Sequence, residues 1–241
     1  MTTAFVSDLH LDARRPEVTT LFREFLANEA RTLDGLYILG DLFEAWIGDD
    51  DPDPHNGVVR QDLAALTAAG VPAWFMHGNR DFLVGDAFSR ETGVQLLDDP
   101  IVVDLYGTST LLTHGDALCT DDVDYQTFRA TVRNPAWQQA FLSQPVDARR
   151  RLAAQARAES QRQQSGKSMD IMDVNQGEVV KMMRDHGVTR MIHGHTHRPD
   201  THQFAVDGVQ YTRIVLGDWY EQGSILRCDE SGCELQQLPL P

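Results

Sequence analysis

The sequence has few cysteines, few basic residues and no long apolar run. Only three cysteines occur among 241 residues and none forms a CxxC pair, which argues against a disulfide framework or a cysteine-ligated zinc site and favours a reducing compartment. No apolar stretch approaches the ~18–20 residues that span a bilayer. The first residues carry no basic segment, so we expect neither a transmembrane helix nor a signal peptide.

Positive charge is scarce as well. The 21 Lys and Arg residues stand against 36 Asp and Glu residues, which gives a formal net charge of −15. Such a chain is poorly suited to hold nucleic acid or an anionic bilayer through a broad basic surface. The surplus of carboxylates suits divalent cations, although acidic surfaces also serve solubility alone. At 41% hydrophobic residues the chain can bury a core, and its length indicates one sizeable catalytic domain with an elaboration.

Short apolar runs alternate with amphipathic stretches, which predicts an α/β or layered α+β architecture. Helices are predicted at 18–33 and 61–69, and strands at 3–6, 36–39, 73–76, 110–113 and 191–192. Each strand is followed by Asp, Asn or His, mostly beside a glycine. One such Asp is as easily a helix N-cap. Five strand ends of this kind indicate a shared site, because ligands bind beyond the carboxyl ends of strands in open α/β sheets.

The spacing of these strand ends predicts an insertion. The first three intervals are close to one strand–crossover–strand unit of about 30 or more residues, whereas the interval from His114 to His195 is more than twice as long. Residues 121–168 lack strand character and are predicted to form helices broken at Pro135 and Pro145. This segment carries eight basic and five acidic residues. It is therefore either a solvated helical face or a basic lobe that binds anions beside an acidic, metal-binding body.

Seven side chains of metal-ligand type lie at the strand ends: Asp8, His10, Asp41, Asn79, His114, His195 and His197. Seven exceed the three protein ligands of a catalytic zinc but suit two ions that share a bridging carboxylate. The mixture of imidazole and carboxylate favours Mn²⁺, Fe²⁺ or Zn²⁺ over Ca²⁺ or Mg²⁺. Two ions about 3.5–4 Å apart would clamp a phosphoryl group and lower the pKa of a water.

The ordered set resembles the calcineurin-like metallophosphoesterase superfamily, whose pattern is DxH, GD, GN[HR][DE], a His before Gly, and GHxH. The surrounding stretches are similar to the branch that hydrolyses UDP-2,3-diacylglucosamine in the lipid A synthesis of Gram-negative bacteria. They cover residues 41–50, 77–83, 114–116, 119–122, 171–175 and 193–199, and the similarity runs from residue 8 to residue 224. The resemblance implies one domain over residues 1–241, a four-layer α/β/β/α sandwich interrupted by a helical cap at 121–168.

The resemblance also implies roles for individual residues. A first metal would be held by Asp8, His10, Asp41 and His197. A second would be held by Asp41, Asn79, His114 and His195, with Asp41 bridging and Mn²⁺ as the working ion. Residues expected to act in catalysis are Asn79, Arg80, His114 and His195. Substrate contacts are expected from Asn79, Arg80, Asp122, Tyr125, Arg157, Ser160, Gln164, Lys167 and His195.

The implied reaction is attack of water on the α-phosphorus of UDP-2,3-diacylglucosamine, which gives UMP and 2,3-diacylglucosamine 1-phosphate. Arg80 fits this reaction, although many members of the superfamily have His at its position. Arginine cannot donate a proton near neutral pH, which an alkoxide leaving group would need and a phosphate leaving group does not. Its guanidinium can instead stabilise charge on the phosphoryl oxygens.

The lipid substrate implies a peripheral protein on the cytoplasmic side of the inner membrane, with no nucleic acid partner, and we expect a monomer. Apolar side chains of the insertion could line a cleft for the acyl chains, although ordinary packing of the helices onto the core is the commoner role for any one of them: Val123, Tyr125, Phe128, Trp137, Phe141 and Leu152. The acidic triplet at 49–51 is expected to be a solvated loop. Two alternatives remain: a soluble phosphoesterase acting on another nucleotide anhydride or phosphodiester, and a degenerate member that binds partners without catalysis.

Overall fold

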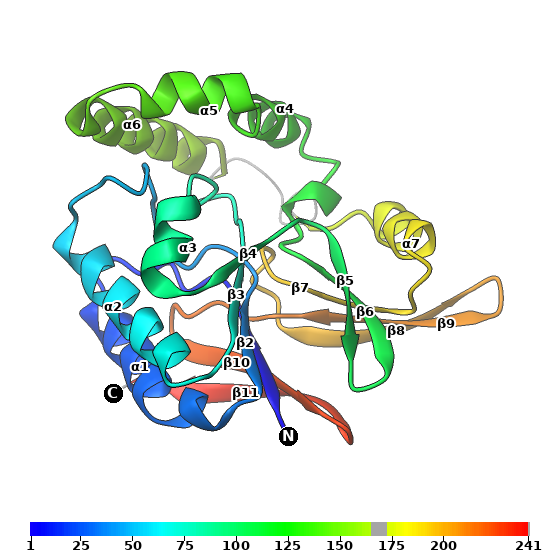
Figure 1. Cartoon of the computed structure of the whole chain (residues 1–241). Helices are drawn as coiled ribbons and strands as arrows, with labels where there is room; N and C mark the ends of the chain where they lie inside the picture. The colour runs from blue at the N-terminus through cyan, green and yellow to red at the C-terminus, as the bar shows by residue number, and fades with distance from the viewer. Residues whose placement is uncertain (165–172, 241) are drawn as a thin grey trace.

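Two β-sheets lie at the centre of the molecule, and helices cover their outer faces (Figure 1). The computed structural model describes residues 1–164 and 173–240. In spatial order, the six-stranded sheet contains β11 (Gly232–Pro239), β10 (Gln222–Asp229), β1 (Thr3–Val6), β2 (Gly35–Ile38), β3 (Ala73–Met76) and β4 (Gln95–Leu97). The five-stranded sheet contains β5 (Ile101–Leu105), β6 (Thr108–Thr113), β7 (Arg190–His193), β9 (Val209–Val215) and β8 (Asp200–Val206).

Alternation of side chains along the strands builds four layers. On β1, Val6 packs in the cluster beneath the helices of one outer face, whereas Phe5 packs between the two sheets. On β7, Ile192 packs between the sheets and Met191 packs outward. Successive strand residues point to opposite faces, so each sheet buries both of its faces. The predicted α/β/β/α metallophosphoesterase sandwich is confirmed.

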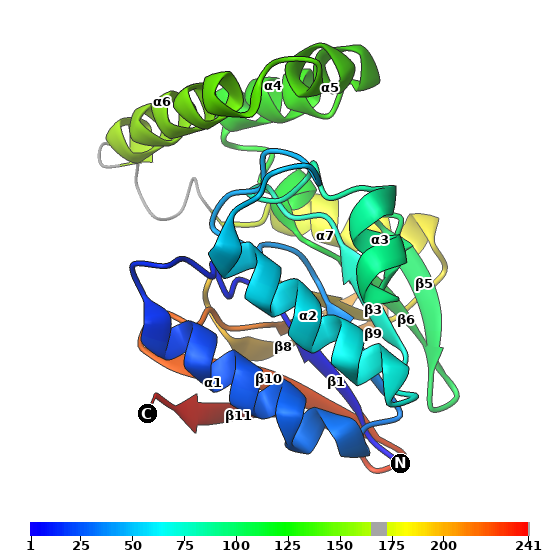
Figure 2. The same cartoon turned by 60° about the vertical axis from the view of Figure 1, so that its left-hand side comes forward.

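The outer layers are formed by four helices. The six-stranded sheet is covered by α1 (Pro16–Ala27), α2 (Pro54–Ala68) and α3 (Asp86–Thr92), of which α1 and α2 run side by side in Figure 2. The five-stranded sheet is covered by α7 (Gln176–Asp185), whose Val179 and Met183 pack with Met191. The first predicted helix is too long. It ends at Ala27, and a separate 3-10 helix follows at Glu29–Thr32.

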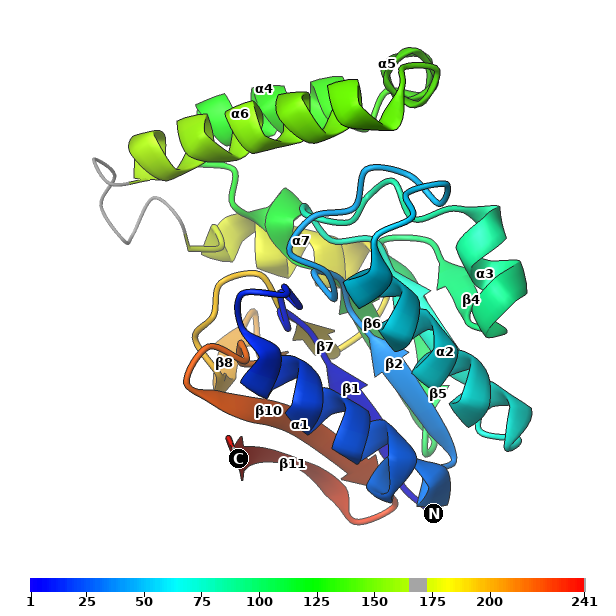
Figure 3. The same cartoon turned by 90° about the vertical axis from the view of Figure 1, so that its left-hand side faces the viewer.

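Three further helices stand apart from the sheets, beyond the end where β1 and β2 finish (Figure 3). They are α4 (Val123–Val132), α5 (Pro135–Leu142) and α6 (Val146–Gln164), and they occupy the segment predicted to be helical. Pro135 occupies the first turn of α5, where its missing N–H costs nothing. The Asn134 side chain accepts hydrogen bonds from two backbone N–H groups of that turn.

The structure contains a disulfide that the cysteine content did not predict. Cys228 and Cys233 lie directly opposite each other on β10 and β11 and are joined by a disulfide, whereas Cys119 is buried elsewhere. This pairing weakens the inference of a reducing compartment. Within the described residues, no helix is both long enough and apolar enough to cross a membrane.

Candidate metal centre

Five of the seven predicted ligands have a backbone conformation that most residues avoid. Asp8, His10, Asp41, His195 and His197 have φ angles between +48° and +67°, and only two other non-glycine residues of the described chain have positive φ. Asp and His tolerate this left-handed region better than most side chains, and such outliers cluster at functional sites. The strained turns after β1, β2 and β7 therefore position these side chains at the site.

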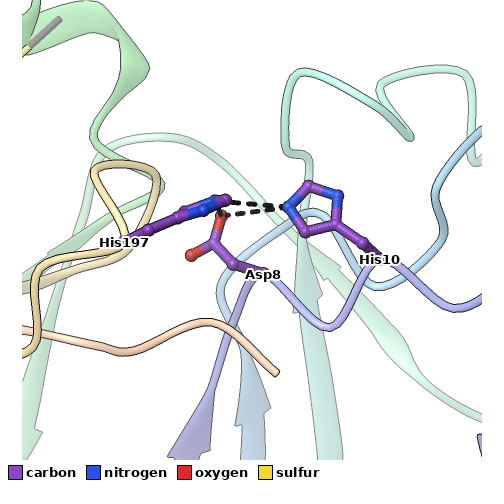
Figure 4. Close-up of side chains that lie close together, drawn as sticks. All are labelled: Asp8, His10 and His197. Atoms are coloured by element: carbon purple, nitrogen blue, oxygen red, sulfur yellow. Dashed lines mark hydrogen bonds and ion pairs between the residues drawn. The ribbon is translucent and has the colours of Figure 1, made fainter. Parts of the chain in front are cut away.

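A first group of donors forms around Asp8 (Figure 4). His197 Nε2 lies 3.3 Å from Asp8 Oδ1, His10 Nε2 lies 3.9 Å from the same oxygen, and the two nitrogens are 3.3 Å apart. The other oxygen, Oδ2, accepts hydrogen bonds from Ser7 Oγ and from the backbone N–H of His195. Oδ1 is buried without a hydrogen-bond partner in the described residues. A buried carboxylate oxygen that faces two imidazoles fits a divalent cation.

Asp41 presents one oxygen to this group and one to a second group. Its Oδ2 lies 3.8 Å from His10 Nε2, and its Oδ1 lies 3.8 Å from His114 Nε2. Asn79 Oδ1 lies 3.0 Å from His114 Nε2 and 2.9 Å from His195 Nδ1. The structure therefore brings all seven predicted ligands together in two adjoining groups, with Asp41 between them.

The crowding of carboxylates and imidazoles shifts their pKa values. Burial alone would lower the pKa of His114, but Asp41 and Asp8 raise it to about 9. Burial and the neighbouring His114 lower the pKa of His195 to about 4. Burial would raise the pKa of Asp8, but His197 holds it far below its usual range. The site therefore holds a buried, ionised carboxylate among imidazoles, which is a donor set that suits divalent cations.

Three residues without a predicted role contact the rings of His10 and His197 away from the nitrogens that face the other ligands. Glu44 Oε2 lies 3.1 Å from His10 Nδ1, and Asp218 Oδ2 lies 3.4 Å from His197 Nδ1. Tyr220 stacks on His10 with ring centroids 5.4 Å apart and planes 8° apart. Metal-binding histidines commonly direct the second ring nitrogen to a carboxylate. Asp218 and Tyr220 follow the end of β9, just as the ligands follow other strands. Their position in the sequence could therefore have identified them as residues of the site.

The loop after β3 is shaped by Asp81 and Gly78. Asp81 is fully buried, and its carboxylate accepts hydrogen bonds from four backbone N–H groups in the loops after β2 and β3. Burial and the nearby Asp41 raise the pKa of Asp81 to about 7. A side chain at Gly78 would collide with the Asp41 carboxylate, whose Oδ1 also accepts a hydrogen bond from the backbone N–H of Arg80.

A cavity of about 370 Å³ adjoins the two ligand groups. Six of the predicted substrate contacts line it: Asn79, Arg80, Asp122, Tyr125, Ser160 and His195. Arg157 contacts Glu44 instead. Lys167 lies outside the described residues, as does the side chain of Gln164.

The apolar side chains of the insertion do not share one cleft, which corrects the expectation. Phe141 is buried in the core beneath the helices, with Trp137 packed against it. Val123 and Trp137 line a separate hollow of about 900 Å³ along α4 and α5. Phe128 and Leu152 are 45% and 41% exposed.

Several arginines of the insertion pair with carboxylates of the sheet-bearing body. The pairs are Arg129 with Asp116, Arg149 with Asp50, Arg150 with Asp51, and Arg157 with Glu44. Arg149 is only 1% exposed and also donates a hydrogen bond to the carbonyl of Ile47. These four cations hold the helices to the loops, so this part of the insertion's positive charge is paired within the chain.

The acidic triplet is exposed at Asp50, as expected of a solvated loop, but its carboxylates also have partners in the protein. The Asp49 carboxylate accepts hydrogen bonds from three backbone N–H groups at the start of α3 and from the indole of Trp46. Asp50 and Asp51 bind arginines of α6. Each carboxylate therefore has a structural partner, and none joins the ligand groups.

Two facing sheets with seven nitrogen and oxygen donors beyond their strand ends define a metallophosphoesterase. The chain belongs to the calcineurin-like phosphoesterase family, whose model matches residues 1–199. It is 54% identical to a UDP-2,3-diacylglucosamine hydrolase of Stenotrophomonas maltophilia and 51% identical to one of Vibrio parahaemolyticus, in each case over 99% of both chains. A solved archaeal phosphodiesterase shares the fold, with a TM-score of 0.50 at 15% identity over the full length of both chains.

Proposed function

We propose that this protein hydrolyses the pyrophosphate bond of UDP-2,3-diacylglucosamine in lipid A biosynthesis and gives UMP and 2,3-diacylglucosamine 1-phosphate. The observation that carries the proposal is the seven-donor cluster beside a cavity that Arg80 lines. The 51–54% identity to hydrolases named for this substrate supports the choice of substrate.

The two ligand groups would hold two divalent cations, Mn²⁺ in first place and Fe²⁺ or Zn²⁺ as alternatives. The orphaned Asp8 Oδ1 and the placement of the two Asp41 oxygens support this occupancy. Bound cations would polarise the phosphoryl oxygens and lower the pKa of the attacking water.

Among the described residues, Arg80 is best placed to stabilise the transition state. Its Nε is buried and has no hydrogen-bond partner in the described part of the chain, so the guanidinium has donor capacity left for an anion. Its fixed charge would stabilise the phosphoryl oxygens while water attacks the α-phosphorus. The departing sugar 1-phosphate needs no proton, so Arg80 does not have to act as an acid.

Other side chains of the cavity orient the substrate. Asn79 places a neutral amide among the donors and therefore does not repel an anionic substrate. Asp122, Tyr125 and Ser160 would contact the glucosamine or the phosphates from the insertion. The contacts from Arg157, Gln164 and Lys167 remain predictions.

We propose that the protein acts as a monomer at the cytoplasmic face of the inner membrane, where a diacylated substrate resides. Flotation of the full chain with vesicles of inner-membrane lipids tests this location, and a chain that stays with the soluble fraction would contradict it.

Relative turnover of two substrates tests the proposed reaction. With Mn²⁺, UDP-2,3-diacylglucosamine in detergent micelles should be cleaved with a far higher kcat/KM than bis(p-nitrophenyl) phosphate. Arg80→His should lose roughly 10²–10³-fold in kcat, the usual loss for one charge-stabilising donor, while its Mn²⁺ content stays unchanged. Equal turnover of the two substrates would instead favour a general phosphodiesterase.

A further inference from the structure

We infer that Glu44 is a positioning residue that couples His10 to Arg157, so that metal binding at the first ligand group and docking of α6 beside the cavity stabilise each other. The inference depends on the proposed function only in taking His10 as a metal ligand.

Glu44 contacts both partners at once. The residue is 6% exposed. Its Oε2 lies 3.1 Å from His10 Nδ1, and its Oε1 pairs with the Arg157 guanidinium. The backbone carbonyl of Glu44 also accepts a hydrogen bond from Arg157 Nη1 at 3.4 Å. Each oxygen of the Glu44 carboxylate contacts a different partner. A movement of Arg157 should therefore shift the carboxylate and change the distance between Oε2 and His10 Nδ1.

His10 has only one ring nitrogen directed away from the ligands. Its Nε2 faces Asp8, Asp41 and His197, so Nδ1 faces Glu44. His10 Nδ1 makes no hydrogen bond within the described residues, although Glu44 Oε2 lies 3.1 Å away. A cation on Nε2 would leave the ring proton on Nδ1, and acceptance of that proton by the nearby carboxylate would fix the ring and strengthen the ligand. Glu44 is therefore the carboxylate expected to strengthen His10 as a ligand.

Arg157 occupies the part of α6 that reaches the cavity. The pairs of Arg149 and Arg150 hold the first turns of the helix, whereas Ser160, three residues after Arg157, lines the cavity. Residues three apart share one face of a helix, so the contact of Arg157 with Glu44 sets the position of Ser160. The two ends of the Glu44 contact thus lie at the metal ligands and at the substrate-facing side of α6.

Coupling between two sites is reciprocal in free energy. Binding of a cation at the first ligand group should stabilise the docking of α6 on the body, and weaker docking of α6 should lower the affinity for the cation. Asp51, which binds Arg150 on the same helix but is not part of the ligand groups, offers a matched control.

The experiment uses the metal-depleted full chain and its variants Glu44→Ala, Glu44→Gln, Arg157→Gln and Asp51→Asn. Mn²⁺ affinity is measured by titration calorimetry, and the trypsin cleavage rate at the arginines of α6 is measured with and without Mn²⁺. Glu44→Ala should weaken Mn²⁺ binding about 10–100-fold. Glu44→Gln keeps an oxygen for His10 and should weaken it less.

The trypsin assay provides a readout that a merely structural role would not move. Mn²⁺ should slow cleavage of α6 in the unsubstituted chain and in Asp51→Asn, but not in Glu44→Ala, Glu44→Gln or Arg157→Gln. Equal Mn²⁺ affinity of Glu44→Ala and the unsubstituted chain, or equal protection of α6 in both, would overturn the inference. If Glu44→Ala does not fold, Glu44→Gln decides by the trypsin readout alone: loss of the Mn²⁺-dependent protection supports the inference, and unchanged protection overturns it.

Failure of the proposed function would look different. The unsubstituted chain would then bind Mn²⁺ and protect α6, yet leave UDP-2,3-diacylglucosamine uncleaved. An unsubstituted chain that binds no Mn²⁺ would overturn the inference itself.

Discussion

Asp116 is the point at which one substitution should loosen helix α4 most. The residue is fully buried at the start of a short 3-10 helix, Asp116–Leu118. Its Oδ2 accepts hydrogen bonds from Tyr125 Oη at 2.7 Å and from Arg129 Nε at 2.8 Å. Arg133 Nη2 lies 3.8 Å from the same oxygen. Asp116→Asn keeps the shape of the side chain and removes the charge that these groups share.

The magnitude follows from the bonds that lose their charge. A hydrogen bond to a charged group contributes about 1.5–3 kcal/mol and a neutral one about 0.5–1.5 kcal/mol, so two weakened bonds should cost about 2–3 kcal/mol. Arg129 is partly exposed, so water can solvate its guanidinium when the charge of Asp116 is removed. The loss of stability therefore stays at this level rather than higher. For a chain of this length, the melting temperature should fall by roughly 4–12 °C.

Urea denaturation of the metal-depleted chain measures this loss without a contribution from bound cations. Tyr125→Phe removes only one of the two bonds and should cost about half as much. Asp116→Asn and Arg129→Gln should be non-additive, with a coupling energy of about 1 kcal/mol. A loss below about 0.5 kcal/mol for Asp116→Asn, the level of an ordinary surface substitution, would refute the reasoning.

Three further substitutions test other parts of the molecule. Gly78→Ala should cost more than about 10²-fold in kcat/KM, because the new Cβ displaces the Asp41 carboxylate; unchanged kinetics would show that the loop adjusts. Asp49→Ala removes the carboxylate that caps α3 and should lower the free energy of unfolding by about 1–2 kcal/mol, with a smaller loss for Asp49→Asn. Asp99→Asn should raise the melting temperature at pH 8, since burial and Asp116 raise the pKa of Asp99 above the ordinary 3.8. The ionised form therefore costs stability once the pH exceeds 3.8, and the gain should disappear as thermal melts approach pH 3.

The strands that carry ligands could be predicted, and the edge strands could not. The strands at 3–6 and 73–76 were predicted with the bounds that the structure shows, because each is a short apolar run followed by a ligand motif. In contrast, β4 has only three residues, and β11 at the sheet edge mixes polar and apolar side chains. Strands of this kind form through pairing with their neighbours and leave no apolar run in the sequence.

The same limit applies to the site. The seven ligands follow strand ends and were visible in the spacing of the sequence. Glu44 was within a recognised motif, but its partner Arg157 lies 113 positions away, and Arg149 lies 99 positions from Asp50. Pairs of this kind depend on how the insertion docks, which neither periodicity nor composition records.

Hydrolysis of UDP-2,3-diacylglucosamine in ¹⁸O-water with Mn²⁺ tests the central claim most directly. Attack on the α-phosphorus predicts ¹⁸O in UMP and none in 2,3-diacylglucosamine 1-phosphate, with turnover that a chelator abolishes. Label in the sugar phosphate, or turnover that persists without a divalent cation, would contradict the account.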